Sequence, residues 1–293
     1  MSGASSVAPA VAARIFLAFA FAYFFSALLR AVTATLAPTF GAELGLKAAD
    51  LGLLAGAYFL GFAALQLPLG SALDRRGPKQ VLLALLSVAV VGCAAFALAQ
   101  SVGGLIVARV LIGVGVAACL MAPLTAYRAR FSVPAQLRAN SWMLMTGSLG
   151  MVASTLPVQW LLPHWGWRGL FWALSALLLL AMAIVALAVP RDDPPVARVT
   201  GPAADGGYRA IVAHPIFVRS TPMGFFIYGG LVAIQALWAG PWLTRVAGWT
   251  ADQAAGGLFV INVCMLAAFM VWGIVMPRLT ARGVGVHGLM LWG

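Results

Sequence analysis

Between two long apolar runs, the chain carries the charged stretch Gly70-Ser71-Ala72-Leu73-Asp74-Arg75-Arg76-Gly77-Pro78-Lys79. The runs on its two sides, Leu51–Leu73 and Gln80–Ala99, are consistent with the roughly 20 apolar residues that a helix needs to cross about 30 Å of hydrocarbon. The stretch therefore predicts two membrane-spanning helices that are joined by a tight polar turn.

The composition extends this prediction to the whole chain. With 63% hydrophobic residues, 9% charged residues and a mean hydropathy of +0.99, the 293 residues could not cover a soluble globule with polar surface. Strands of a membrane barrel would be about half as long and would alternate in polarity, and neither feature is present. We expect an all-α membrane protein with these spanning helices: Ile15–Phe40, Leu51–Leu73, Gln80–Ala99, Val102–Thr125, Ser141–Leu162, Gly169–Val189, Met223–Leu243 and Ala254–Met276.

The net charge of +11 does not indicate a nucleic-acid partner, because the basic residues lie in short loops at alternate helix ends and form no single stripe. With the N-terminus in the cytoplasm, thirteen of the 18 Lys and Arg residues fall inside, and Lys47, Arg168 and Arg245 fall outside. Basic loops resist translocation, so this asymmetry predicts a multi-pass protein of a bacterial inner membrane with a cytoplasmic N-terminus. Tryptophans, which favour the membrane interface, gather at the predicted outer ends of helices five to eight: Trp160, Trp165, Trp167, Trp172, Trp238, Trp242 and Trp249.

The charged stretch resembles the loop between the second and third helices of the major facilitator superfamily. That pattern is Gly, three residues, Asp, Arg, any residue, Gly and then basic residues, and Pro78 is the departure from it. In the fourth span, Arg109 with Gly113 and Gly115 resembles the fourth-helix motif of the same superfamily, whose glycines let a neighbouring helix approach closely. The resemblance implies two six-helix bundles that rock about a midplane site. It also implies a cytoplasmic latch between the bundles, formed here by Gly70, Asp74, Arg75, Gly77 and Lys79.

A long polar segment, residues 190–213, is rich in Asp, Pro and Gly. It predicts a cytoplasmic linker between a complete first bundle, residues 1–189, and a partial second bundle, residues 214–293. Helices seven and eight repeat features of helices one and two at an offset of 203 residues, which separates Gly70 from Gly273 and Arg75 from Arg278. Two such units exceed the length of the chain, so we expect a transporter truncated a few residues into helix nine. A complete eight-helix protein is the alternative.

Two arginines lie inside predicted spans, where a charge costs at least a few kcal/mol unless it faces water or a partner. Arg30 shares one helix face with Tyr23, Ser26 and Thr33, and this polar stripe predicts the cavity-facing side of the first span. Arg109 lies at a similar depth in the fourth span. Because all seven acids fall in loops or at helix ends, the two guanidinium groups predict a site for an anionic substrate. The alternative is that backbone carbonyls or residues of the absent helices satisfy each arginine.

The opposite wall of the cavity is predicted on helices seven and eight. Gln235 belongs to a stripe on helix seven, and Asn262 is the strong hydrogen-bonding side chain of helix eight. Plain helix packing is the alternative interpretation for both residues. On the fifth helix, the small residues Gly147, Gly150 and Ser154, followed by Pro157, suit tight packing and a kink.

We therefore expect secondary transport of a small organic or inorganic anion, with protons or another ion as the coupling partner. No nucleophile, metal-ligand or phosphate-loop pattern appears, so neither an enzyme, a metal site nor a cofactor is expected. The fifth helix lacks the Gly-Pro pair of the superfamily's antiporter signature, which slightly disfavours drug efflux. Two alternatives are a truncated membrane protein that transports nothing and a multidrug exporter, which would usually carry an acid within the membrane.

Overall fold

The computed structural model describes residues 8–190, 212–234 and 238–281, and the regular elements of these residues are all helices. This confirms the all-α prediction, while most of the expected linker, residues 190–213, lies outside the described residues. The helices are α1 (Pro9–Glu43), α2 (Ala48–Arg76), α3 (Pro78–Leu98), α4 (Val102–Val116), α5 (Met121–Arg130), α6 (Val133–Ala153), α7 (Leu156–Ala188), α9 (Pro215–Ala233), α10 (Ala239–Arg245) and α11 (Ala251–Ala281).

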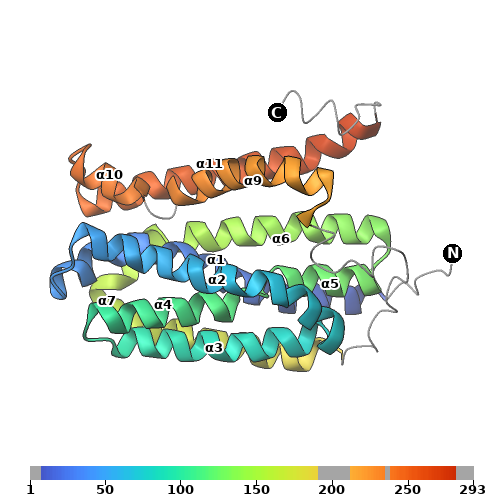
Figure 1. The fold of residues 1–293 in the computed structure, drawn as a ribbon, viewed down its shortest axis with the longest axis horizontal. Helices are drawn as coiled ribbons and strands as arrows, with labels where there is room; N and C mark the ends of the chain where they lie inside the picture. Colours follow the sequence, from blue (N-terminus) through green and yellow to red (C-terminus); the bar gives the residue numbers. More distant parts are fainter. Residues whose placement is uncertain (1–7, 191–211, 235–237, 282–293) are drawn as a thin grey trace.

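The long helices run side by side along one axis, as Figure 1 shows, so the molecule has two ends. One end holds Glu43, Ala99 and the α10–α11 connection, and we call it the Glu43 end; the other holds the α2–α3 turn, and we call it the Asp74 end. Helix α1 lies inside the bundle, and α9, α10 and α11 line one side of it next to α6 (Figure 1). Seven helical segments in the described ranges are long and apolar enough to cross a membrane, so the chain is a multi-pass membrane protein.

The predicted fifth and sixth spans need corrected boundaries. The fifth begins at Val133, eight residues before the predicted Ser141, and it is broken between α6 and α7 at Ser154 and Thr155. Helix α7 then holds a second break at Gly166, whose φ of 63° is not helical, and the sixth span starts there. The Ser154 carbonyl that the first break frees accepts a hydrogen bond of 2.7 Å from the Thr35 hydroxyl of α1. A side chain of a neighbouring helix thus provides the hydrogen bond that the carbonyl loses where the helix is interrupted.

The fourth span lies very close to its neighbours because it carries glycines at the contact. A Cβ atom added at Gly113 would lie 2.1 Å from the Tyr58 carbonyl oxygen of α2, and one at Gly115 would lie 2.2 Å from the Ala89 nitrogen of α3. The predicted close approach through these two glycines is confirmed. On the other side of the bundle, α6 meets α1 in the same way, since a Cβ at Gly150 would lie 2.3 Å from the Phe24 carbonyl oxygen.

A polar cluster fastens three helices at the Glu43 end, beyond the apolar run of α1. The Trp167 indole donates a hydrogen bond of 2.6 Å to one Glu43 oxygen, and Arg168 forms a salt bridge with the other. Arg168 also donates to the Ala99 carbonyl after α3, over 3.3 Å. The pKa of Glu43 lies below its ordinary value, mainly because of the hydrogen bond from Trp167 and secondly because of Arg168. Trp167, predicted to straddle the interface, is instead buried against Phe40 and Phe96.

Adding one methyl group at Gly113 tests the close approach of α4 and α2. We expect Gly113→Ala to destabilise the protein by about 1–3 kcal/mol, because the new Cβ collides with backbone and the helices must separate. The matched control is Gly56→Ala on α2, where a Cβ meets nothing within 4 Å. That change should be neutral or stabilise by up to about 1 kcal/mol. Thermal unfolding in detergent, followed by circular dichroism, measures both, and equal melting temperatures would contradict the packing argument.

The Glu43 cluster predicts a pH dependence. Since the folded pKa of Glu43 is lowered, its stabilising contribution is fully present above the pKa of the unfolded chain and is lost as the pH falls through the lower, folded pKa. We expect the melting temperature of the wild-type protein to fall more as the pH is lowered than that of Glu43→Gln. Thermal unfolding at pH 6, 5, 4 and 3 provides the comparison. If the melting temperatures of the two proteins fall equally with pH, Glu43 does not stabilise the protein through this cluster.

Candidate functional site

A cavity of about 100 Å³ lies between α1 and α6 on one side and α9 and α11 on the other. Its polar lining comes from Tyr23 and Arg30 of α1, Ser148 of α6 and Asn262 of α11. Apolar side chains of α6, α9 and α11 complete the wall. We call it the Arg30 cavity, and it brings together three of the residues that the sequence predicts as substrate ligands, namely Tyr23, Arg30 and Asn262.

Arg30 lies deep within the length of α1. Thirteen residues separate it from Glu43 at the helix end, which corresponds to about 20 Å along the axis. Its guanidinium carbon lies 5.8 Å from the centre of the Phe62 ring, and the side chain is half-buried. No carboxylate is among the residues that line the cavity. The cavity therefore has a positive group at depth with neutral hydrogen-bonding groups around it.

Close packing positions the neutral groups of the cavity. The Tyr23 ring lies directly over Gly147, because a Cβ added there would be 2.7 Å from Tyr23 Cε1. Ser148 and Asn262 each donate to the carbonyl one turn back in their own helix, over 3.2 Å and 2.8 Å. These bonds fix the two side chains against their helices while they line the cavity. Hydroxyl and amide groups beside a guanidinium suit the oxygens of a small anion.

The predicted stripe on α1 does not face one space. Ser26 is buried in helix contacts, and Thr33 lines a second pocket, so neither lines the Arg30 cavity. Gln235 lies outside the described residues, and its place in the site stays a prediction. The residues of the stripe therefore lie in three different places: a packed helix contact, the Arg30 cavity and the second pocket.

Arg109 is enclosed in the contact between α1, α2 and α4. Its side chain is 1% exposed, and Nη1 donates a hydrogen bond of 2.9 Å to the Leu29 carbonyl. Nε donates to the Leu54 carbonyl over 3.4 Å, and the guanidinium carbon lies 4.6 Å from the centre of the Tyr58 ring. Arg109 lines neither the Arg30 cavity nor the second pocket. This is the arrangement that the alternative of backbone carbonyl partners predicts.

The charged turn at the Asp74 end has a clear local geometry. Gly77 ends α2 with a φ of 81°, a conformation that favours glycine, and Pro78 occupies the first turn of α3, where its missing N–H costs nothing. Lys79 Nζ donates to the carbonyls of Ala186 and Val189 at the end of α7, over 2.7 Å and 2.6 Å. Lys79 thus caps a helix of the same bundle, where a cation is favoured by the helix dipole.

Other members of the predicted latch are open to solvent or lack close neighbours. Asp74 and Arg75 are exposed, and a Cβ at Gly70 would meet nothing within 4 Å. Asp74 makes no hydrogen bond or ion pair with another residue of the described ranges. A latch between bundles stays a prediction for Gly70, Asp74, Arg75 and Gly77.

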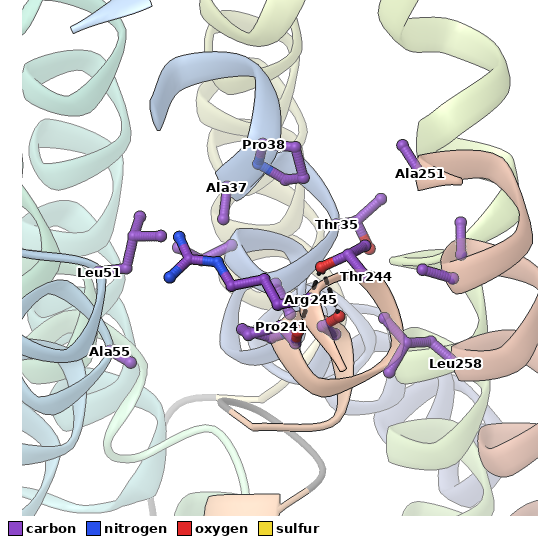
Figure 2. A pocket seen from close by; sticks show the side chains of 15 residues that line it. Thr35, Ala37, Pro38, Leu51, Ala55, Pro241, Thr244, Arg245, Ala251 and Leu258 are labelled. Carbon is purple, nitrogen blue, oxygen red and sulfur yellow. Dashed lines mark hydrogen bonds between the residues drawn. The ribbon is translucent and has the colours of Figure 1, made fainter. Parts of the chain in front are cut away.

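Sequence reasoning missed a second pocket, of about 200 Å³, at the Glu43 end. It lies between α1, α2, α10 and α11, and Figure 2 shows the Arg245 side chain reaching across it from α10 toward Leu51 of α2. Most of the lining residues are Ala, Pro, Leu and Thr, which carry no motif. The 203-residue repeat was the available signal, because the same offset relates Pro38 to Pro241 and both prolines line this pocket. We call it the Arg245 pocket.

The spanning helices define a multi-pass membrane protein with a polar cavity among them. The chain belongs to the major facilitator superfamily, whose family model matches residues 19–293. It is 29% identical to the inner membrane transport protein YajR of Escherichia coli over 185 residues, or 62% of this chain and 40% of that protein. It is 28% identical over 281 residues to the MFS-type transporter Rv1877 of Mycobacterium tuberculosis, or 91% of this chain and again 40% of the relative.

Solved structures share the fold. A bacterial homologue of the human lysosomal transporter Spinster, in an inward-facing and unoccupied conformation, matches with a TM-score of 0.70 at 21% identity, covering 94% of this chain and 64% of that one. The D-xylose–proton symporter matches with a TM-score of 0.61 at 15% identity, covering 92% of this chain and 69% of that one. The chain thus spans 40% of the length of the curated relatives that it matches.

Replacing each arginine in turn distinguishes a packing role from a cavity role. We expect Arg109→Gln to destabilise the protein by about 2–4 kcal/mol, because it leaves a void and a poorly satisfied amide in a closed contact. Arg30→Gln should cost clearly less, since its side chain borders a cavity. Thermal unfolding of the two purified variants in one detergent provides the comparison. A larger loss for Arg30→Gln would reverse the two assignments.

Proposed function

We propose that this chain takes part in the transport of a small anionic solute and that Arg30 is the principal ligand of the anion. The observation that carries the proposal is the placement of Arg30 in a cavity whose lining has no carboxylate. A guanidinium that borders a cavity can bind a carboxylate or phosphate group of the solute through a two-pronged contact.

The position of the Arg30 cavity supports an alternating-access mechanism. Its walls come from α1 and α6 of the predicted first bundle and from α9 and α11 of the predicted second bundle. A solute in it contacts both, so rocking of one bundle against the other opens the cavity to one side and then to the other. The inward-facing Spinster homologue is similar in fold, which supports a moving-bundle mechanism for this chain.

Orientation and coupling complete the proposal. The distribution of basic residues supports a cytoplasmic Asp74 end and an external Glu43 end. YajR is named an inner membrane protein, which supports the same location here. One neighbour in fold is a proton symporter, which supports a proton as the coupling ion.

Uptake into proteoliposomes tests the role of Arg30. The chain is reconstituted, and initial rates are measured with radiolabelled acetate, benzoate and inorganic phosphate as probes. For a probe that the wild-type protein takes up, we expect Arg30→Gln to lower the rate about 10- to 100-fold, which is the loss of one charge-assisted contact. Arg30→Lys keeps the charge but not the planar fork and should fall in between.

Arg219→Gln is the control, because Arg219 is an exposed cation on α9 that lines neither cavity. Its rate should equal that of the wild-type protein. Unchanged uptake in Arg30→Gln would refute the proposed ligand. If the wild-type chain takes up none of the probes, the non-transporting alternative is favoured.

A further inference from the structure

The Arg245 pocket combines one cation with an apolar wall. Among its lining residues Arg245 is the single charged side chain, and the remaining polar side chains are the threonines of α1 and α10. Pro38 and Leu51 face Leu258 and the small residues of α11 across the space (Figure 2). At about 200 Å³ the pocket is twice as large as the Arg30 cavity, which is far more room than one water molecule or a small inorganic ion needs.

Arg245 makes no ion pair within the described ranges, although acids lie at the same end of the bundle. Each of those acids has another partner. Glu43 binds Trp167 and Arg168, Asp50 accepts from the Lys47 backbone, and Asp252 accepts from Gln159 over 3.0 Å. The side chain of Arg245 is exposed and borders an apolar space, so an anion there would meet a cation that no carboxylate neutralises.

A second feature of the pocket wall is a buried hydroxyl group without a hydrogen-bond partner in the described part of the chain. The Thr33 hydroxyl is buried, with the residue 7% exposed, and it has no hydrogen-bond partner in the part of the chain that the structure describes. Thr35, two residues further, is also buried but donates to the Ser154 carbonyl. An unsatisfied buried hydroxyl is unfavourable, and Thr33 places one in the wall of this pocket.

We propose that the Arg245 pocket binds an organic monocarboxylate that carries an apolar group. The carboxylate pairs with Arg245, and the apolar group packs against Pro38, Leu51 and Leu258. Thr33 lies at the Arg30 side of the pocket, and three residues, or about 4.5 Å of helix rise, separate it from Arg30. The two binding positions therefore follow one another along α1, and the Arg245 pocket selects the organic group before the anion reaches Arg30. This order of use rests on the proposed function, whereas binding at Arg245 does not.

Equilibrium binding to the purified chain in detergent tests the inference without any transport step. The probes are radiolabelled benzoate and acetate, two monocarboxylates that differ in the apolar ring. We expect benzoate to bind at least tenfold more tightly than acetate. We expect Arg245→Gln to weaken benzoate binding at least tenfold and Arg245→Lys to weaken it less. Ala37→Phe, which fills the apolar wall, should also weaken it, while Arg219→Gln should leave it unchanged. Thermal unfolding verifies that each variant is folded.

Arg30→Gln separates this inference from the proposed function. Tight benzoate binding that persists in Arg30→Gln but is lost in Arg245→Gln supports the pocket as a site of its own. Benzoate binding that is lost in Arg30→Gln and kept in Arg245→Gln overturns the inference while it supports the proposed function. Equal affinities for acetate and benzoate, or no benzoate binding by the wild-type chain, also overturn the inference.

Discussion

The cations within the membrane spans must find partners in a chain whose acids all lie in loops or at helix ends. The structure meets this constraint differently for the two arginines concerned. Arg109 is closed in by backbone carbonyls of α1 and α2 and by the face of Tyr58. Arg30 borders a cavity that spans the contact between two groups of helices. Leu29 and Arg30 are adjacent on α1. The carbonyl of Leu29 binds the packed Arg109, whereas the side chain of Arg30 borders the polar cavity.

Both spaces are lined by α11 and by α1, and α1 lies inside the bundle. It contributes Tyr23 and Arg30 to one cavity and Thr33 to Pro38 to the other, while Phe24 lies against Gly150 of α6. Helix α1 lies so close to α6 at Gly150 that a side chain larger than hydrogen would not fit there, and this contact fixes the distance between the two helices. The geometry of recognition in this protein is thus a consequence of glycine-mediated packing as much as of the polar residues themselves.

Much of the fold could be predicted from the sequence, because long apolar runs, the charged turn and small-residue spacing are local signals. The cavity position of Arg30 also followed from its helix face. Whether Arg109 is buried or faces a cavity could not be predicted, because an arginine bonded to backbone carbonyls and one that lines a cavity have the same sequence pattern. Lys79 matched a family motif, but its contacts with Ala186 and Val189 join residues about a hundred positions apart. The Arg245 pocket was missed because small apolar residues carry no signal of the space that they enclose.

The break at Ser154 and Thr155 has a mechanical consequence. In an unbroken helix, bending strains the ladder of backbone hydrogen bonds, and each bond that opens in a bilayer lacks water to replace it. Here the Ser154 carbonyl already lies outside the ladder and is held by the Thr35 hydroxyl of another helix. The two segments of the fifth span meet where the ladder is already open, so a change in their angle would break fewer backbone hydrogen bonds there than elsewhere along the span.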